Sequence, residues 1–157
     1  MSISSHLSSK DMEEIKKTRD GLHEARHLPG YFYTSNDIFQ LEMDKIFMRE
    51  WLCIGRVEEY EKNGDYQAFR IANEPVLVCR GLDGEIRAFR NLCQHRGVEV
   101  AVGKGNGKLF VCRYHAWSYD TLGNLKAAPH SEQVKNFDFK SCHLPTLKLD
   151  TWGGYIF

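Results

Sequence analysis

The sequence lacks an excess of charge of either sign and lacks any long apolar run. Lysine and arginine together number 21, as do aspartate and glutamate, so the formal net charge is zero. Such a balance provides no field that would favour nucleic acid or an anionic membrane as a partner. Residues 1–17 are charged and serine-rich. We therefore expect no signal peptide, no membrane span and a cytoplasmic protein.

The chain also lacks a CxxC motif. Its five cysteines are an odd number, which argues against a disulfide framework. Cys53, Cys79 and Cys142 stand alone in apolar or mixed segments, and we expect them to be buried free thiols. Cys93 and Cys112 are different, because each precedes a histidine by two or three residues.

These two cysteines belong to the most informative pattern in the chain. Cys93 and His95 form one tight pair, and Cys112 and His115 form a second pair after an interval of sixteen residues. In a Rieske-type [2Fe-2S] centre, two histidines replace two cysteines on one of the irons. We predict that Cys93 and Cys112 hold one iron, and that His95 and His115 hold the iron that accepts the electron.

Three other interpretations of the four residues are open. A structural zinc site also uses two cysteines and two histidines, but its usual order pairs like with like, whereas each pair here is mixed. A disulfide between Cys93 and Cys112 would need an oxidising compartment. Loop residues without a metal would leave unexplained why glycine and aromatic residues crowd the same two loops.

Residues 1–50 are predicted to form a helical arm. Ser8 and Asp11 fit a capping box at the start of a charged helix over about residues 9–26, which the Leu-Pro-Gly of residues 28–30 ends. A second helix is expected from residue 34 or 35. Its apolar residues form one stripe, which we expect to be core contact: Phe39, Met43, Ile46 and Phe47.

From residue 51 onward the pattern changes to short alternating runs separated by turn dipeptides, which indicates an antiparallel, mainly β domain over residues 51–157. Strands are expected at residues 52–57, 66–71, 75–79, 86–89, 109–111 and 117–119. Residues 103–107 are expected to be a flexible turn, and residues 152–157 a last strand. A strand that ends the chain without a polar tail is odd, so we expect the natural polypeptide to be longer.

The two loops Cys93–Gly97 and Cys112–Tyr119 resemble the cluster loops of the Rieske oxygenases, the large (α) subunits of aromatic-ring-hydroxylating dioxygenases and related monooxygenases. The resemblance covers about residues 28–157. Two positions depart from it, because Arg113 stands where the family often has proline and Ala116 where it usually has glycine. These departures affect the expected fine geometry and potential of the cluster, but not the ligand set.

This resemblance implies an antiparallel Rieske (ISP-like) β-sandwich with an N-terminal helical arm. We expect Gly97 to let a backbone amide approach the cluster, the alternative being an ordinary turn, and we expect Tyr114 and Trp117 to shield the site from water, the alternative being plain core. Arg96, in the first cluster loop, is expected to lie beside the cluster as well. Respiratory Rieske proteins are similar but add a disulfide and a serine hydroxyl near the cluster, and this chain has neither. We therefore expect a reduction potential in the lower part of the Rieske range, roughly −150 to 0 mV.

In that family the Rieske domain passes electrons from a ferredoxin or flavin reductase to a mononuclear non-haem Fe(II), which activates O2. That iron needs a facial triad of two histidines and a carboxylate, which the resemblance places in a C-terminal catalytic domain that this chain lacks. It further implies a homotrimer, in which the ligand equivalent to His115 meets an acidic residue of the neighbouring subunit. The organic substrate, and the choice between monooxygenase and dioxygenase, lie outside what these residues report.

Two further functions stay open. A free-standing Rieske ferredoxin would share the cluster loops but lack the helical entry between residues 28 and 51. A zinc-stabilised binding module would be colourless. The stretch His23–His27 also fits the H-E-x-x-H pattern of zinc proteases, but its segment is polar, ends at once in Leu28 and Pro29, and has no persuasive third ligand.

Overall fold

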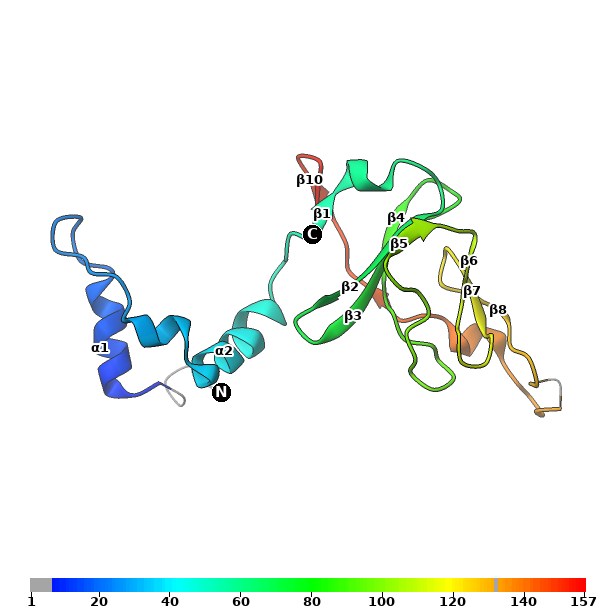
Figure 1. Cartoon of the computed structure of the whole chain (residues 1–157), viewed down its shortest axis with the longest axis horizontal. Coiled ribbons are helices and arrows are strands. Elements are labelled where there is room, and N and C mark those ends of the chain that lie inside the picture. Colours follow the sequence, from blue (N-terminus) through cyan, green and yellow to red (C-terminus); the bar gives the residue numbers. More distant parts are fainter. Residues whose placement is uncertain (1–6, 132) are drawn as a thin grey trace. The chain divides into compact units, whose positions relative to one another are not determined.

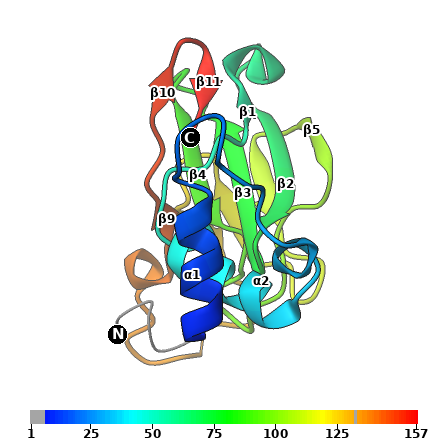
Figure 2. The ribbon, with the colours of Figure 1, turned by 90° about the vertical axis from the view of Figure 1, so that its left-hand side faces the viewer.

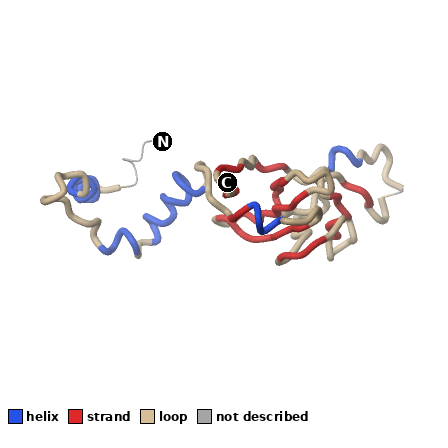
Figure 3. The backbone as a smooth tube through the Cα atoms, turned by 90° about the horizontal axis from the view of Figure 1, so that it is seen from above, coloured by secondary structure: helices blue, strands red, loops and turns tan. Residues whose placement is uncertain are grey.

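The computed structural model describes residues 7–131 and 133–157 of the chain. By the contacts between its residues the chain divides into two compact units, one up to Glu50 and one from Trp51 onward. Helices make up the regular structure of the first unit and strands dominate the second (Figures 1 and 3). Among the described residues, no helix has the length and apolar character that crossing a membrane requires.

The first helix of the N-terminal unit is α1 (Ser9–Lys17). The predicted capping box is confirmed, because Asp11 N–H donates to the Ser8 hydroxyl while Ser8 N–H donates to the Asp11 carboxylate. The helix ends at Lys17 and not near Arg26 as predicted. The Thr18 hydroxyl donates to the carbonyl of Ile15 at this end, which satisfies one of the last helical carbonyls.

The second helix of this unit is built in three pieces: a 3₁₀ turn (Gly30–Tyr33), α2 (Asn36–Glu42) and a π-helical turn (Met43–Phe47). Ser35 caps α2 by accepting a hydrogen bond from Ile38 N–H, as predicted. Of the apolar stripe, only Met43 is buried. The expectation of core contact is wrong for Phe39, Ile46 and Phe47, whose side chains are exposed.

The unit from Trp51 onward is antiparallel throughout its described strand pairs, as predicted. Its largest sheet has the order β5 (Lys104–Asn106), β2 (Asp65–Ile71), β3 (Glu74–Arg80), β4 (Ile86–Arg90) and β9 (Thr146–Leu147), which Figure 2 shows side by side. A second sheet has the order β6 (Leu109–Val111), β7 (Ser118–Asp120) and β8 (Leu125–Ala127). The third joins β1 (Gly55–Arg56), β11 (Tyr155–Ile156) and β10 (Thr151–Trp152).

Three segments differ from the sequence-based expectation. Of the strand expected at residues 52–57 only Gly55–Arg56 forms, and a 3₁₀ turn follows at Val57–Tyr60. Residues 103–107 contain strand β5, which pairs with β2, so the expectation of a flexible turn is wrong. The end of the chain is a hairpin and not one strand, because Gly153 and Gly154 both adopt positive φ values, of 58° and 82°, between β10 and β11. Two residues with positive φ make the tight turn that suits an antiparallel pair.

Strand β3 explains how the core of this unit is divided. Leu77 and Cys79 face one apolar cluster, while Val76 and Val78 face a second cluster on the other side of the sheet. All four side chains are buried, as expected for a continuous apolar run in a central strand. The first cluster also contains both cysteines of the predicted metal site.

The three remaining cysteines are free thiols but differ in burial. Cys79 is fully buried, and burial raises the pKa of its thiol to about 12. Cys142 is half-buried, and Cys53 is exposed. The expectation of burial is therefore wrong for Cys53, which lies in the coil that leads into β1.

Candidate metal centre

The first predicted ligand pair lies on a six-residue loop, residues 93–98, which we call loop 1. Cys93 N–H donates to the carbonyl of Val98 at 2.8 Å, and Gly97 N–H donates back to the carbonyl of Cys93 at 2.8 Å. Gly97 adopts a positive φ of 69°, which favours glycine. The two hydrogen bonds close the loop on itself and leave His95 at its tip.

The second ligand pair lies on a loop with the same backbone, residues 112–117, which we call loop 2. Cys112 N–H donates to the carbonyl of Trp117 at 2.8 Å, and Ala116 N–H donates to the carbonyl of Cys112 at 2.9 Å. Ala116, like the fifth residue of loop 1, has a positive φ, here 57°. The two halves of the site are thus structural repeats of each other.

The stems of the two loops are closed by different means. Loop 2 continues the hairpin of β6 and β7, in which Val111 pairs with Ser118. At the base of loop 1 the described strands form no such pair, and the side chain of Asn91 makes the closing hydrogen bonds instead. Its amide oxygen accepts hydrogen bonds from the N–H groups of Val100 and Ala101 at 3.0 Å each, and its amide nitrogen donates to the carbonyl of Ala101 at 2.8 Å.

The two cysteines at the loop bases are buried and adjacent. Each is only 3% exposed. Burial raises the pKa of the Cys93 thiol, and the neighbouring Cys112 thiol raises it further. Metal binding requires the thiolate, so a cation at this place would have to displace the proton and stabilise the negative charge.

Tyr119 supplies a polar group to the cysteine side of the site. Its hydroxyl accepts a hydrogen bond from Gln94 N–H at 2.9 Å and lies 3.4 Å from Cys93 Sγ. Because the hydroxyl already accepts from a backbone N–H, its own proton is free to be donated to the sulfur. Burial raises the pKa of Tyr119, so this proton is retained.

The two histidines meet on the outer side of the loops. The ring centroids of His95 and His115 are 4.7 Å apart, at an interplanar angle of 65°. His115 Nδ1 is buried and has no hydrogen-bond partner among the described residues. Desolvation lowers the pKa of His115, and the positive charges of His95 and Arg96 lower it further. The neutral imidazole is the form that binds a metal.

Aromatic side chains surround the histidines. The Trp117 indole stacks on His95 with a centroid distance of 4.9 Å and an interplanar angle of 12°. The ring centroids of Tyr114 and His115 are 3.8 Å apart, and Tyr114 is more than half exposed. The Arg96 guanidinium lies 6.0 Å from the centre of the Tyr114 ring. The structure therefore brings three of the predicted neighbours of the cluster, Arg96, Tyr114 and Trp117, to the side of the site where the histidines lie.

The residues present fit a two-iron cluster better than a single ion. Within residues 7–131 and 133–157, no three histidine, cysteine or acidic side chains are placed to hold one metal ion. Sulfur lies beside sulfur and imidazole beside imidazole, which is the division of ligands between the two irons of a Rieske centre. An imidazole nitrogen that is buried without a partner is costly unless a ligand completes it.

The stretch His23–His27 has no helix to support a zinc motif. Residues 22–24 form a turn and residues 25–27 are irregular, so the two histidines do not share a helical face. Both histidines are exposed.

Residues 50–138 match the family model of the Rieske [2Fe-2S] domain. The chain belongs to this family. Over its whole length it is 39% identical to the glycine betaine monooxygenase oxygenase subunit of Pseudomonas aeruginosa, and over 85% of its length it is 37% identical to the benzene 1,2-dioxygenase subunit alpha of Pseudomonas putida. It spans only 38% and 30% of the lengths of these two relatives.

The solved structures agree with this assignment. The Rieske chain superposes on the quaternary ammonium Rieske monooxygenase CntA in complex with L-carnitine with a TM-score of 0.75 at 33% identity, over 82% of this chain and 37% of that one. The predicted resemblance to Rieske oxygenases is therefore confirmed, as is the Rieske β-sandwich. Membership in the family implies a [2Fe-2S] cluster.

Sequence reasoning found the ligand loops but missed Asn91 and Tyr119 as parts of the site. Nothing in the local sequence marks Asn91 as part of the site. Its three backbone partners lie nine and ten residues later in the chain, and only the fold places them beside its side chain. For Tyr119 a signal existed, since a buried tyrosine usually finds a partner for its hydroxyl. Its partner could not be read from the sequence.

Proposed function

We propose that this Rieske domain binds its [2Fe-2S] cluster through Cys93 and Cys112 on one iron and through His95 and His115 on the other. The observation that carries the assignment is the orphaned Nδ1 of His115, buried beside a second imidazole. The adjacent buried thiols on the inner side support it. Arg96, Gly97, Tyr114 and Trp117 would form the wall around this ligand set.

The cluster, when bound, would take up and release one electron at a time. The residues of the chain prepare the site for that step. The Tyr119 hydroxyl donates toward Cys93 Sγ, and a hydrogen bond to sulfur favours the more negative, reduced state. Trp117 and the apolar cluster beneath the cysteines keep water from the inner side, which disfavours added charge. These opposing contributions set the potential.

We further propose that the domain serves an oxygenase subunit, as in its relatives. It would receive electrons from a ferredoxin or flavin reductase and deliver them to a mononuclear non-haem iron in a catalytic domain beyond residue 157. In this arrangement His115 would lie toward the catalytic domain of a neighbouring α-subunit in a homotrimer. The helical entry before residue 51 and the identity of 39% with the matching part of an oxygenase subunit favour this role over that of a free-standing ferredoxin.

The sequence identities of this domain do not separate one substrate class from another. Its identity to subunits named for quaternary ammonium substrates, 39% and 36%, is close to its identity to benzene and chlorobenzene dioxygenase subunits, 37% and 36%. Similar identities across different chemistries are expected when the shared function is electron transfer. We place substrate choice in the catalytic domain.

The assignment is tested by colour, iron content and electron paramagnetic resonance (EPR). Protein made with intact iron-sulfur assembly should be coloured, contain two irons and two sulfides per chain, and give a mixed-ligand EPR signal after anaerobic reduction. His95→Ala and His115→Ala should each abolish this signal, whereas His23→Ala, in the exposed arm, should leave it unchanged. Colourless protein with one zinc per chain would overturn the proposal.

A further inference from the structure

The ring of His95 packs against two other aromatic rings of the site. Metal-binding histidines usually donate their second ring N–H to a carboxylate or a backbone carbonyl, which fixes the orientation of the ring. Within the described part of the chain, the His95 ring makes no hydrogen bond. Its ring contacts are the face of Trp117, at 4.9 Å and 12°, and the ring of His115, at 4.7 Å.

Trp117 is well placed to act as this support. It belongs to loop 2, while His95 belongs to loop 1, so the stacking joins the two halves of the site. The indole is buried, at 7% exposure, whereas the imidazole is exposed. A buried ring in a packed core is held in place by its neighbours, and an exposed ring stacked flat on it loses most of its rotational freedom.

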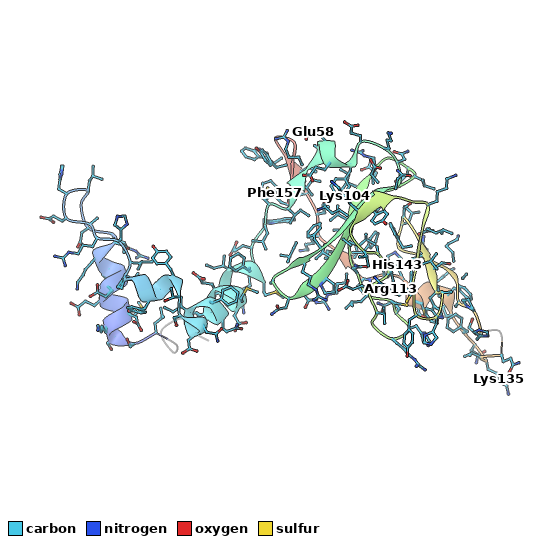
Figure 4. The ribbon with its side chains drawn as sticks, in the orientation of Figure 1. Glu58, Lys104, Arg113, Lys135, His143 and Phe157 are labelled. Carbon is cyan, nitrogen blue, oxygen red and sulfur yellow. The ribbon has the colours of Figure 1, made fainter. Side chains whose placement is uncertain are left out.

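A second layer of aromatic side chains supports Trp117. Phe137 meets the indole edge-on, with a centroid distance of 5.6 Å and an interplanar angle of 79°. Phe139 meets Phe137 in the same way, at 5.1 Å and 83°. Both phenylalanines follow β8, on a segment whose loop extends outward to Lys135 (Figure 4). The segment after β8 thus reaches His95 through one chain of contacting rings.

We infer that Trp117 is a positioning residue that sets the imidazole plane of His95, and that Phe137 acts through Trp117. This inference rests on the proposed function, because it gives His95 its role as an iron ligand. Trp117 would thus do more than exclude water from the site. We therefore predict that the chemical character of the side chain at residue 117, a flat ring or an aliphatic group, decides how His95 binds.

The test compares four variants of the cluster-loaded protein by EPR and by the rate at which iron is lost to a chelator. Trp117→Leu removes the flat face, and Trp117→Phe keeps a smaller one. Phe137→Leu removes only the support behind the indole. Phe89→Leu is the matched control, because Phe89 is a buried aromatic residue of the same apolar cluster but contacts His143 and not His95.

We expect Trp117→Leu to change the g values of the reduced cluster and to lose iron about 10 to 100-fold faster, the usual effect of removing a residue that orients a metal ligand. Phe137→Leu should show the same changes to a smaller extent. Trp117→Phe and Phe89→Leu should keep the g values of the unsubstituted protein.

Two results would overturn the inference while leaving the ligand assignment intact. One is an unchanged signal and iron-loss rate in Trp117→Leu. The other is an equal change in Phe89→Leu, which would show a general effect of a softened core. If Trp117→Leu does not fold, the comparison of Phe137→Leu with Phe89→Leu decides, and equal behaviour of those two contradicts the inference. Absence of a [2Fe-2S] signal from the unsubstituted protein would instead refute the proposed function.

Discussion

Loop 1 and loop 2 have the same backbone hydrogen bonds but are stabilised differently. Loop 2 grows out of the ladder between β6 and β7, so its base is held by main-chain groups. The base of loop 1 is held by one side chain, that of Asn91, which satisfies three backbone groups of residues 100 and 101. The base of loop 2 is closed by main-chain hydrogen bonds between β6 and β7, so it should tolerate side-chain substitutions. The base of loop 1 is closed by the Asn91 side chain, so a substitution there should open it.

The two loops also differ at the residue that turns the chain back. Gly97 and Ala116 occupy equivalent positions, with φ values of 69° and 57°. Glycine adopts this region without strain, while alanine has a cost of roughly 1–2 kcal/mol there. Loop 2 therefore stores strain at the position where loop 1 has none, and its ladder offsets that strain.

The largest expected effect concerns the base of loop 1. Asn91→Ala leaves two buried N–H groups and one carbonyl without their partner, and each loss costs roughly 1–3 kcal/mol. The free energy of unfolding, measured by urea denaturation, should fall by about 3 kcal/mol or more. Asn63→Ala is the control, because Asn63 is exposed and makes a single side-chain hydrogen bond, to the carbonyl of Leu82. Equal losses in the two variants would refute the role given to Asn91.

A smaller effect is expected at Tyr119, whose hydroxyl makes hydrogen bonds with two groups of loop 1. Tyr119→Phe removes the acceptor of Gln94 N–H in loop 1 and the donor to Cys93 Sγ. It should lower the free energy of unfolding by about 1–3 kcal/mol, and lower the reduction potential, because the reduced cluster loses a stabilising hydrogen bond. Tyr60→Phe, in the other apolar cluster, should leave the potential unchanged in a redox titration. A potential that rises in Tyr119→Phe would contradict this role.

The smallest effect is a pair of opposite changes at the turn positions. Gly97→Ala should destabilise the protein by about 1 kcal/mol through backbone strain alone, since an added Cβ would meet no atom within 4 Å. Ala116→Gly should stabilise it by about 0.5–1 kcal/mol, because relief of strain exceeds the added entropy of the unfolded chain. Thermal unfolding of both variants measures the difference. Changes of the same sign would show that the loops are not equivalent.

The features that could be predicted from the sequence are mostly those formed by residues close together in the chain. The ligand loops are local, and the spacing of Cys93 to His95 and of Cys112 to His115 was sufficient to predict their shared chemistry. The buried run of β3 and the capping box at Ser8 were equally local signals. Each of these depends on residues close in the chain.

Features that depend on distant partners were not predicted. Strand β5 exists because β2 offers an edge to residues 104–106, which read as a glycine-rich turn. The support from Asn91 and the hydroxyl of Tyr119 require the folded sheets to bring partners together. The end of helix α1 is an exception, because its Thr18 cap is local, yet the charged residues that follow did not mark where the helix stops.

The central claim is that both loops contribute one sulfur and one imidazole nitrogen to the same cluster. Pulsed EPR of the reduced protein, with histidine alone labelled with ¹⁵N, tests this claim most directly. The account predicts strong couplings to two inequivalent histidine nitrogens on one iron, and loss of the assembled mixed-ligand signal when either His95 or His115 is replaced. Coupling to one nitrogen or to none, with the cluster intact, would contradict it.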